Sequence, residues 1–108
     1  MDFDDLLKLM VEKGGSDMFI TAGVPPSVKI NGKIVPITKN PLSPDVVREV
    51  VMSIMSEDQR LEFQRSKECN FAISQRGIGR FRVSAYYQRN LASMVLRRIE
   101  TNIPTVDV

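Results

Sequence analysis

Apolar residues at the start of the chain follow a helical period and then give way to a strand-like segment. Over about residues 2–13 they recur three or four positions apart, at Phe3, Leu6, Leu7, Met10 and Val11. Gly14 and Gly15 come next and are expected to end this helix. The following stretch, DMFIT at residues 17–21, is rich in residues that favour strands. We therefore predict a helix followed by a short strand.

Residues 27–37, with the sequence SVKINGKIVPI, have the clearest hairpin pattern in the chain. Apolar and polar residues alternate on both sides of Asn31-Gly32, a pair that supplies the two positive-φ positions of a type I′ turn. Pro36 has no N–H for a central strand, so the returning strand is expected at a sheet edge or a bulge. An exposed edge here would also invite strand pairing between copies of the chain.

A second helix is predicted from its capping residues and from the apolar positions that follow them. Ser43 is a favourable N-cap, and Pro44 fits the first helical position. An apolar stripe then recurs at Val46, Val47, Val50, Val51 and Ile54. Valine also favours strands, but the caps and the period favour a helix.

A third helix is predicted from Ser56, which forms a capping-box pattern with Gln59 three residues later. Leu61 and Phe63 are its expected apolar anchors. Three strands then complete the chain, over residues 69–74, from Arg80 to Asn90, and over residues 92–99, with the glycine turn QRGIG between the first two. This order predicts an antiparallel α+β domain, with a sheet of about six strands and helices packed on one face.

The composition removes several kinds of catalytic site. Histidine is absent, which excludes the usual general base near neutral pH and every nucleophile pair that includes histidine. The lone Cys69 has no partner for a disulfide or a metal site, so we expect a buried structural thiol. No phosphate-binding loop of the G-x-x-x-x-G-K-[ST] type occurs, and RGIGRF is expected to be a tight turn. No apolar run approaches a membrane span and the N-terminus is acidic, so a cytoplasmic protein is expected.

Positive charge is concentrated in the last third of the chain. From Cys69 to Ile99 there are six arginines, no lysine and no acidic residue, whereas the remaining residues carry a net charge of −4. Within the strand that begins at Arg80, period two places one set of polar side chains on a single face: Arg80, Arg82, Ser84, Tyr86 and Gln88. Arg97 and Arg98 diverge to opposite faces, so one of them joins this row.

Three interpretations of the arginine row stay open at this point. The arginines are neutralised by acidic residues of the same chain, or they form a platform for phosphate or for a partner's carboxylates, because guanidinium is a planar fork of donors. They could also hold single-stranded RNA, which needs aromatic side chains on the same face, where only Tyr86 is placed.

Several long strings of the sequence resemble one protein family in the same order. These strings are GGSDMFITAGVPPSVKINGKI, LSPDVVREVV, ECNFAIS, GIGRFRVSAYYQRN and MVLRRIETNIPT. They resemble the N-terminal domain of type IV pilus retraction ATPases of the PilT/PilU family, over essentially all 108 residues. Within that family, ECNFAIS and QRNLASMVLRRIETNIPT are more similar to the PilU-like members.

The resemblance implies a PAS-like domain over residues 1–100 and, at residues 101–108, the start of a linker to a RecA-like ATPase domain outside this chain. It implies a hexamer of full-length chains that uses ATP and Mg²⁺, with no nucleotide or metal held by this part alone. The implied role is pilus retraction and twitching motility, with packing between subunits and closure over nucleotide by six residues: Arg80, Arg82, Gln88, Arg89, Arg97 and Arg98.

The implied partners are a PilT-like motor and the pilus platform protein of the inner membrane. The implied location is the cytoplasmic side of that membrane, without nucleic acid and without direct insertion into lipid. The alternative function is a PAS-type sensor of a small ligand or a protein-interaction domain. The sensor requires an internal cavity with converging polar groups.

Overall fold

A six-stranded antiparallel sheet forms the centre of the fold in the computed structural model, which describes residues 3–99. In chain order the elements are α1 (Phe3–Glu12), β1 (Asp17–Thr21), β2 (Ser27–Ile30), β3 (Lys33–Pro36), α2 (Pro44–Ser53), α3 (Glu57–Ser66), β4 (Glu68–Gln75), β5 (Gly79–Gln88) and β6 (Leu91–Ile99). The predicted α+β class and element order are confirmed. The linker expected at residues 101–108 lies outside the described residues.

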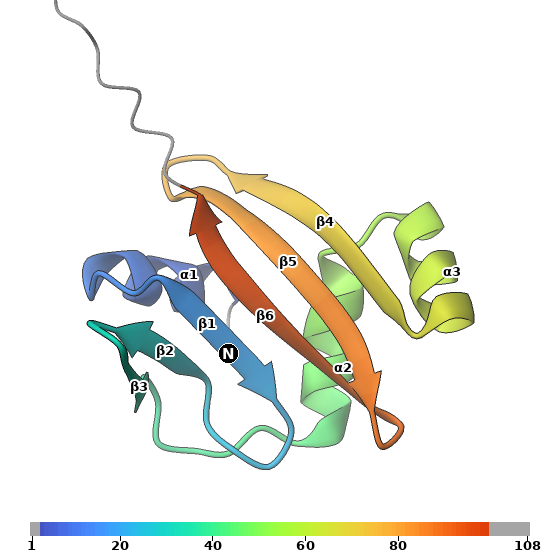
Figure 1. Cartoon of the computed structure of the whole chain (residues 1–108), viewed down its shortest axis with the longest axis horizontal. Coiled ribbons are helices and arrows are strands. Elements are labelled where there is room, and N and C mark those ends of the chain that lie inside the picture. The colour runs from blue at the N-terminus through green and yellow to red at the C-terminus, as the bar shows by residue number, and fades with distance from the viewer. Residues whose placement is uncertain (1–2, 100–108) are drawn as a thin grey trace, which may run out of the picture.

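The strand order in the sheet is β3-β2-β1-β6-β5-β4, with every neighbouring pair antiparallel. The two three-strand meanders therefore meet at the centre, where β1 pairs with β6 (Figure 1). Helices α1 and α2 lie behind the sheet in this view, and α3 lies beside β4 at one edge. Within residues 3–99, no helix lies on the opposite face of the sheet.

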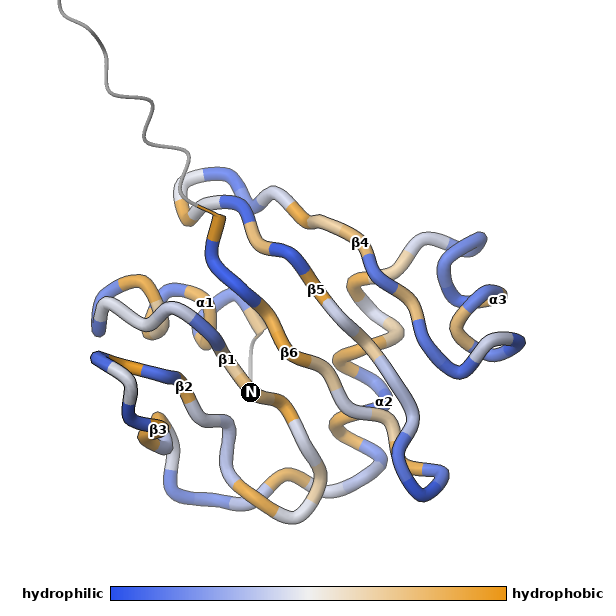
Figure 2. The backbone as a smooth tube through the Cα atoms, viewed as in Figure 1, coloured by the Kyte–Doolittle hydropathy of each residue, from blue (hydrophilic) through white to orange (hydrophobic). Residues whose placement is uncertain are grey.

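The core fills the space between the sheet and the helices. Its largest fully buried side chains come from every layer: Phe63, Phe81, Leu7, Met10, Met18, Ile20, Met94, Leu96, Val28, Val47, Val51 and Val83. Apolar stretches along the central strands and the inner helix faces are visible in Figure 2. At the edge of this core Phe63 of α3 stacks on Tyr87 of β5, with ring centroids 4.5 Å apart. This contact attaches α3 to the sheet.

The predicted caps of α2 and α3 are confirmed. The Ser43 hydroxyl accepts a hydrogen bond from the Val46 N–H at 3.2 Å, and Ser56 forms the full capping box with Gln59. The N–H groups at a helix N-terminus have no partner within the helix, so these side chains satisfy them. None of the helices within residues 3–99 is long and apolar enough to cross a membrane.

Two helical residues that the sequence predicted to pack against the core are exposed to solvent. Leu61 is 59% exposed, although Phe63 on the same helix is fully buried. Successive helical residues are about 100° apart, so Leu61 lies far around the helix from Phe63, and α3 meets the sheet only along one side. Val46 is 38% exposed, so the inner face of α2 centres on Val47 and Val51 instead.

Two further predictions, the buried thiol of Cys69 and the edge position of the strand that contains Pro36, are confirmed. Cys69 is buried, and burial raises the pKa of its thiol, with the nearby Glu62 carboxylate raising it further. A thiol in this setting stays protonated and packs as a small apolar group. At the other sheet edge, β3 contains Pro36 as expected for an outermost strand, and Ile34 is 62% exposed there.

The β5–β6 connection differs from the sequence prediction. Strand β5 ends at Gln88, because Arg89 and Asn90 both have positive φ, at 53° and 64°. Gln88 pairs directly with Leu91, so the two residues between them form a tight turn of the type I′ kind. Arginine is an unusual residue for this position, and the sequence therefore suggested a strand that continued to Asn90.

Replacing Arg89 with glycine should raise the free energy of unfolding by about 0.5–1 kcal/mol. A left-handed residue with a Cβ costs about 1–2 kcal/mol, and the entropy of the unfolded glycine chain offsets part of the gain. Urea unfolding followed by circular dichroism measures the change. Asn90→Gly is the matched control and should gain less, because asparagine tolerates this conformation. A loss of stability in Arg89→Gly would show that the turn depends on the arginine side chain.

Candidate anion-binding face

Strand register places four charged side chains in one row across the uncovered sheet face. Arg82 of β5 pairs directly with Arg97 of β6, Arg97 pairs with Asp17 of β1, and Asp17 pairs with Lys29 of β2. Residues that pair directly across strands project to the same face, with Cβ atoms about 4.5–5.5 Å apart. We call this uncovered face the open face; on β5 and β6 it comprises Arg80, Arg82, Ser84, Tyr86, Gln88, Leu91, Ser93, Val95, Arg97 and Ile99.

The row holds two guanidinium groups and the Lys29 ammonium group, with Asp17 as the one carboxylate among them. Like charges directly opposite each other on neighbouring strands are destabilising, so the Arg82–Arg97 pair costs folding free energy in the absence of a counter-ion. The Arg97 Nε donates to Asp17 Oδ2 at 3.3 Å, and the Ser16 hydroxyl donates to Asp17 Oδ1 at 2.7 Å. The Asp17 side chain is 14% exposed, whereas the Arg97 side chain is 73% exposed.

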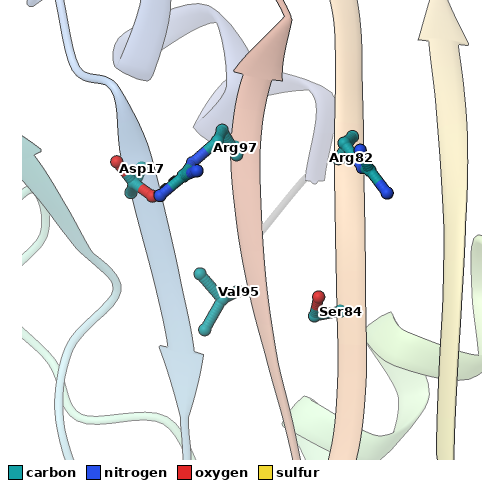
Figure 3. Close-up of a pocket in the computed structure, with 5 residues that line it drawn as sticks. All are labelled: Asp17, Arg82, Ser84, Val95 and Arg97. Atoms are coloured by element: carbon teal, nitrogen blue, oxygen red, sulfur yellow. Dashed lines mark hydrogen bonds and ion pairs between the residues drawn. The ribbon is translucent and has the colours of Figure 1, made fainter.

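A depression of about 390 Å³ lies on the open face at this row. It is lined by Asp17, Arg82, Ser84, Val95 and Arg97. Figure 3 shows the Arg97 side chain extending toward Asp17 and the Arg82 side chain turning toward the opposite side, away from Arg97. Ser84 and Val95 lie further along β5 and β6, below the two arginines in this view. Arg82 also lines a second depression, of about 320 Å³, on the β4 side.

The six residues predicted to act together do not form a single site. Arg80 lies on the open face one alternate position from Arg82, but Arg98 pairs with Phe81 and projects to the helix-covered face. Gln88 and Arg89 lie at the far end of β5 and in its turn, about 20 Å from Arg82 at about 3.3 Å per residue. One small anion therefore cannot contact both ends of the strand.

The interpretation that acids of the same chain neutralise the arginines holds only for Arg97. Among residues 3–99 the Arg97–Asp17 contact is an ion pair, and Arg80, Arg82 and Arg98 form none. Both depressions at the row are lined by Arg82, an exposed residue whose guanidinium forms no ion pair with an acidic residue among residues 3–99. This arrangement makes the row a candidate anion site, and phosphate suits it because two guanidinium forks can each donate to its oxygens.

Sequence reasoning missed Asp17 as a part of the site, and also Phe19. Phe19 pairs with Val95 on the open face, where Tyr86 was the only aromatic residue expected. Both omissions have one cause, because β1 and β6 are far apart in sequence and neither segment indicates that they pair. Alternation within β5 alone placed Arg80 and Arg82 on one face, but it did not show which of Arg97 and Arg98 joins them.

The interior offers little for a small ligand. Among residues 3–99 the one buried polar or charged residue is Ser93, which lies on the open-face side of β6 opposite Tyr86, and the other buried side chains are apolar. An internal sensor site would need several converging polar groups. The PAS-type sensor interpretation is therefore not favoured by the structure, and the open face is the candidate functional site.

Known proteins share both the sequence and the fold. The chain is 69% identical over 107 residues to the type IV pilus ATPase PilU of Pseudomonas aeruginosa and 33% identical over 107 residues to PilT of the same organism. The crystal structure of the pilus retraction motor PilT with bound ADP superposes with a TM-score of 0.90 over 96% of the chain, at 33% identity. No protein-family model matches.

These matches include almost all of the chain but only part of each relative. The chain spans 28% of the PilU sequence, 31% of the PilT sequence and 31% of the crystallised PilT chain. The chain therefore corresponds to one part of each of these longer proteins.

Proposed function

Since the chain is an N-terminal domain of the PilT/PilU family of retraction ATPases, we propose that it serves a hexameric type IV pilus motor as a non-catalytic module. Its open face contributes arginines that close over the phosphates of the nucleotide, and it takes part in packing between subunits. The motor would power pilus retraction and twitching motility beside a PilT-like motor, at the cytoplasmic side of the inner membrane and in contact with the pilus platform protein.

The observation that supports this proposal is the Arg82–Arg97 pair. Two directly paired arginines with one neighbouring carboxylate are unfavourable in the isolated fold, and an anion with several negative charges relieves that repulsion. The crystallised PilT is described with bound ADP, a ligand of this charge type. Nucleotide is therefore the anion that best suits the open face.

The two ends of β5 would serve different contacts. Arg80, Arg82 and Arg97 are close enough to act on one phosphate chain, and Arg98 would support them from the covered face. Gln88 and Arg89 lie about 20 Å away and would contact the neighbouring subunit instead. This division assigns each predicted residue a contact consistent with its place in the sheet.

ATP is the substrate in this proposal, and Mg²⁺ accompanies it. Within the described part of the chain no group of three or more metal-ligating side chains comes together. In this proposal residues 3–99 act on the phosphates and not on the metal. Their contribution is positive charge placed near the phosphates, which would stabilise negative charge that develops during transfer.

Replacing Arg82 or Arg97 with glutamine in the full-length protein should lower ATPase kcat about tenfold or more. A hydrogen bond to a charged group contributes about 1.5–3 kcal/mol, and each 1.36 kcal/mol corresponds to a factor of ten in rate. A coupled ATPase assay measures the rate, and native mass spectrometry reports whether the hexamer forms.

Arg48→Gln is the matched control for this experiment, because it removes the same charge from an exposed position on α2. It should leave kcat within about twofold, since α2 packs on the face of the sheet opposite the row (Figure 1). Normal turnover in both Arg82→Gln and Arg97→Gln would contradict the proposed role of the arginines in nucleotide closure.

A further inference from the structure

We propose that Asp17 is a resident counter-ion that competes with an incoming phosphate group for Arg97, an inference that rests on the proposed anion role of the open face. Asp17 thereby determines how strongly an anion must bind before it recruits the second arginine of the Arg82–Arg97 pair. Neither the alternation in β5 nor the arginine count indicates this role, because Asp17 lies on a strand far away in sequence.

The hydrogen bonds around Asp17 keep the carboxylate fixed and leave Arg97 able to move. Ser16 donates to one carboxylate oxygen at 2.7 Å, and the side chain is mostly buried. Arg97 is attached to the other oxygen by a single long contact from Nε at 3.3 Å, and most of its side chain is in solvent. An exposed ion pair with one such contact is weak, so a better acceptor can displace it.

The position of the depression determines where the Arg97 side chain would turn when its weak contact with Asp17 breaks. Arg97 extends toward Asp17 and Arg82 turns away from it, which separates the two positive charges of the side chains that line the depression (Figure 3). A phosphate group in the depression offers more negative charge than one carboxylate and can accept from both guanidinium groups at once. Arg97 would then leave Asp17 and turn toward the phosphate.

The same arrangement selects between anions. A monocarboxylate or a chloride ion offers no more charge than Asp17 already supplies, so it gains little by displacing Arg97. A polyphosphate offers several charges and also removes the repulsion between the two arginines. Asp17 would therefore discriminate against single charges and in favour of phosphate chains.

The test is a titration of the 108-residue chain with sodium tripolyphosphate, followed by isothermal calorimetry. Asp17→Asn should bind tripolyphosphate about twofold to fivefold more tightly than the parent, the range that an exposed ion pair contributes. When Arg97 is already replaced with glutamine, Asp17→Asn should change the logarithm of the tripolyphosphate affinity by less than about half as much. The reason is that Asp17 weakens anion binding by competing for Arg97.

Glu68→Gln is the matched control, since Glu68 pairs with Tyr86 and so projects to the same open face, away from Arg97. It removes one negative charge and should change the affinity less than about 1.5-fold at physiological ionic strength, where exposed charges are screened. An equal tightening by Glu68→Gln, or an equal effect of Asp17→Asn with and without Arg97, would mean that Asp17 acts only as a distant charge. Either result overturns the inference about Asp17 but does not contradict an anion site on the open face.

A second measurement follows the Arg97 side chain itself. In ¹⁵N NMR spectra of the free chain, the Arg97 Nε–H signal should be resolved and should move on addition of tripolyphosphate, toward a ligand-bound position that Asp17→Asn also reaches. A signal that already coincides in the free parent and in free Asp17→Asn would overturn the inference. If the parent does not bind tripolyphosphate at all, the anion role in the proposed function fails as well, which separates the two proposals.

Discussion

Phe63→Ala is expected to lower the free energy of unfolding of this chain by about 3–5 kcal/mol. Phe63 is fully buried and stacks on Tyr87 at 4.5 Å, so the change leaves a cavity and removes an aromatic contact. Domains of this size are stable by only about 5–15 kcal/mol, so the loss is a large share of the total. The melting temperature measured by differential scanning calorimetry should fall by more than about 10 °C.

The matched control is Leu61→Ala, two residues away on the same helix. Leu61 is 59% exposed, so its truncation should change the free energy of unfolding by less than about 0.5 kcal/mol. Similar losses in the two variants would mean that α3 does not dock through the Phe63–Tyr87 stack. A small effect of Phe63→Ala alone would mean that the edge of the core reorganises around the cavity.

Arg82→Glu is expected to change stability and anion binding in opposite directions. The new carboxylate would lie directly opposite Arg97, so a repulsive pair becomes an attractive one and the free energy of unfolding should rise by about 0.5–1 kcal/mol. Affinity for tripolyphosphate should fall by about 30-fold or more, because the variant loses a charge-assisted donor and places a negative charge beside the ligand. Urea unfolding and calorimetric titration measure the two effects on one sample.

Arg89→Glu serves as the control for Arg82→Glu, since it makes the same charge change about 20 Å along β5. It should leave tripolyphosphate affinity within about twofold, with any residual effect removed by added salt. If Arg82→Glu destabilises the chain, the like-charge pair is not a cost to the fold, and the physical argument for an anion at this row is wrong. A fall in affinity without a gain in stability would point to a second, unrecognised partner of Arg82.

Most of the fold was predictable because its signals are local. Ser43 and Ser56 begin helices through hydrogen bonds to residues three positions away, and Asn31-Gly32 fixes a hairpin turn by its backbone preferences. The alternation along β5 predicted that Arg80 and Arg82 share one face, because side chains of a strand point to alternate faces. In each case the residues that determine the structure are neighbours in sequence.

The rest depended on contacts between distant segments. The ion pair of Asp17 and Arg97 exists because β1 pairs with β6, and these residues are 80 positions apart. The exposure of Leu61 depends on how α3 docks against the sheet edge, which its own sequence does not state. The Arg89 turn was missed for a different reason, since arginine rarely occupies a left-handed position and tertiary pairing of β5 with β6 overrides its preference.

The central place of β6 has a mechanical consequence. This strand is hydrogen-bonded along both of its sides, to β1 and to β5, and its last residue is Ile99. Antiparallel hydrogen bonds run perpendicular to the strands, so tension applied along β6 shears many of them at the same time instead of opening them one by one. A pull that enters the domain at Ile99 would therefore be shared between both meanders, and the sheet would transmit that pull with little local extension.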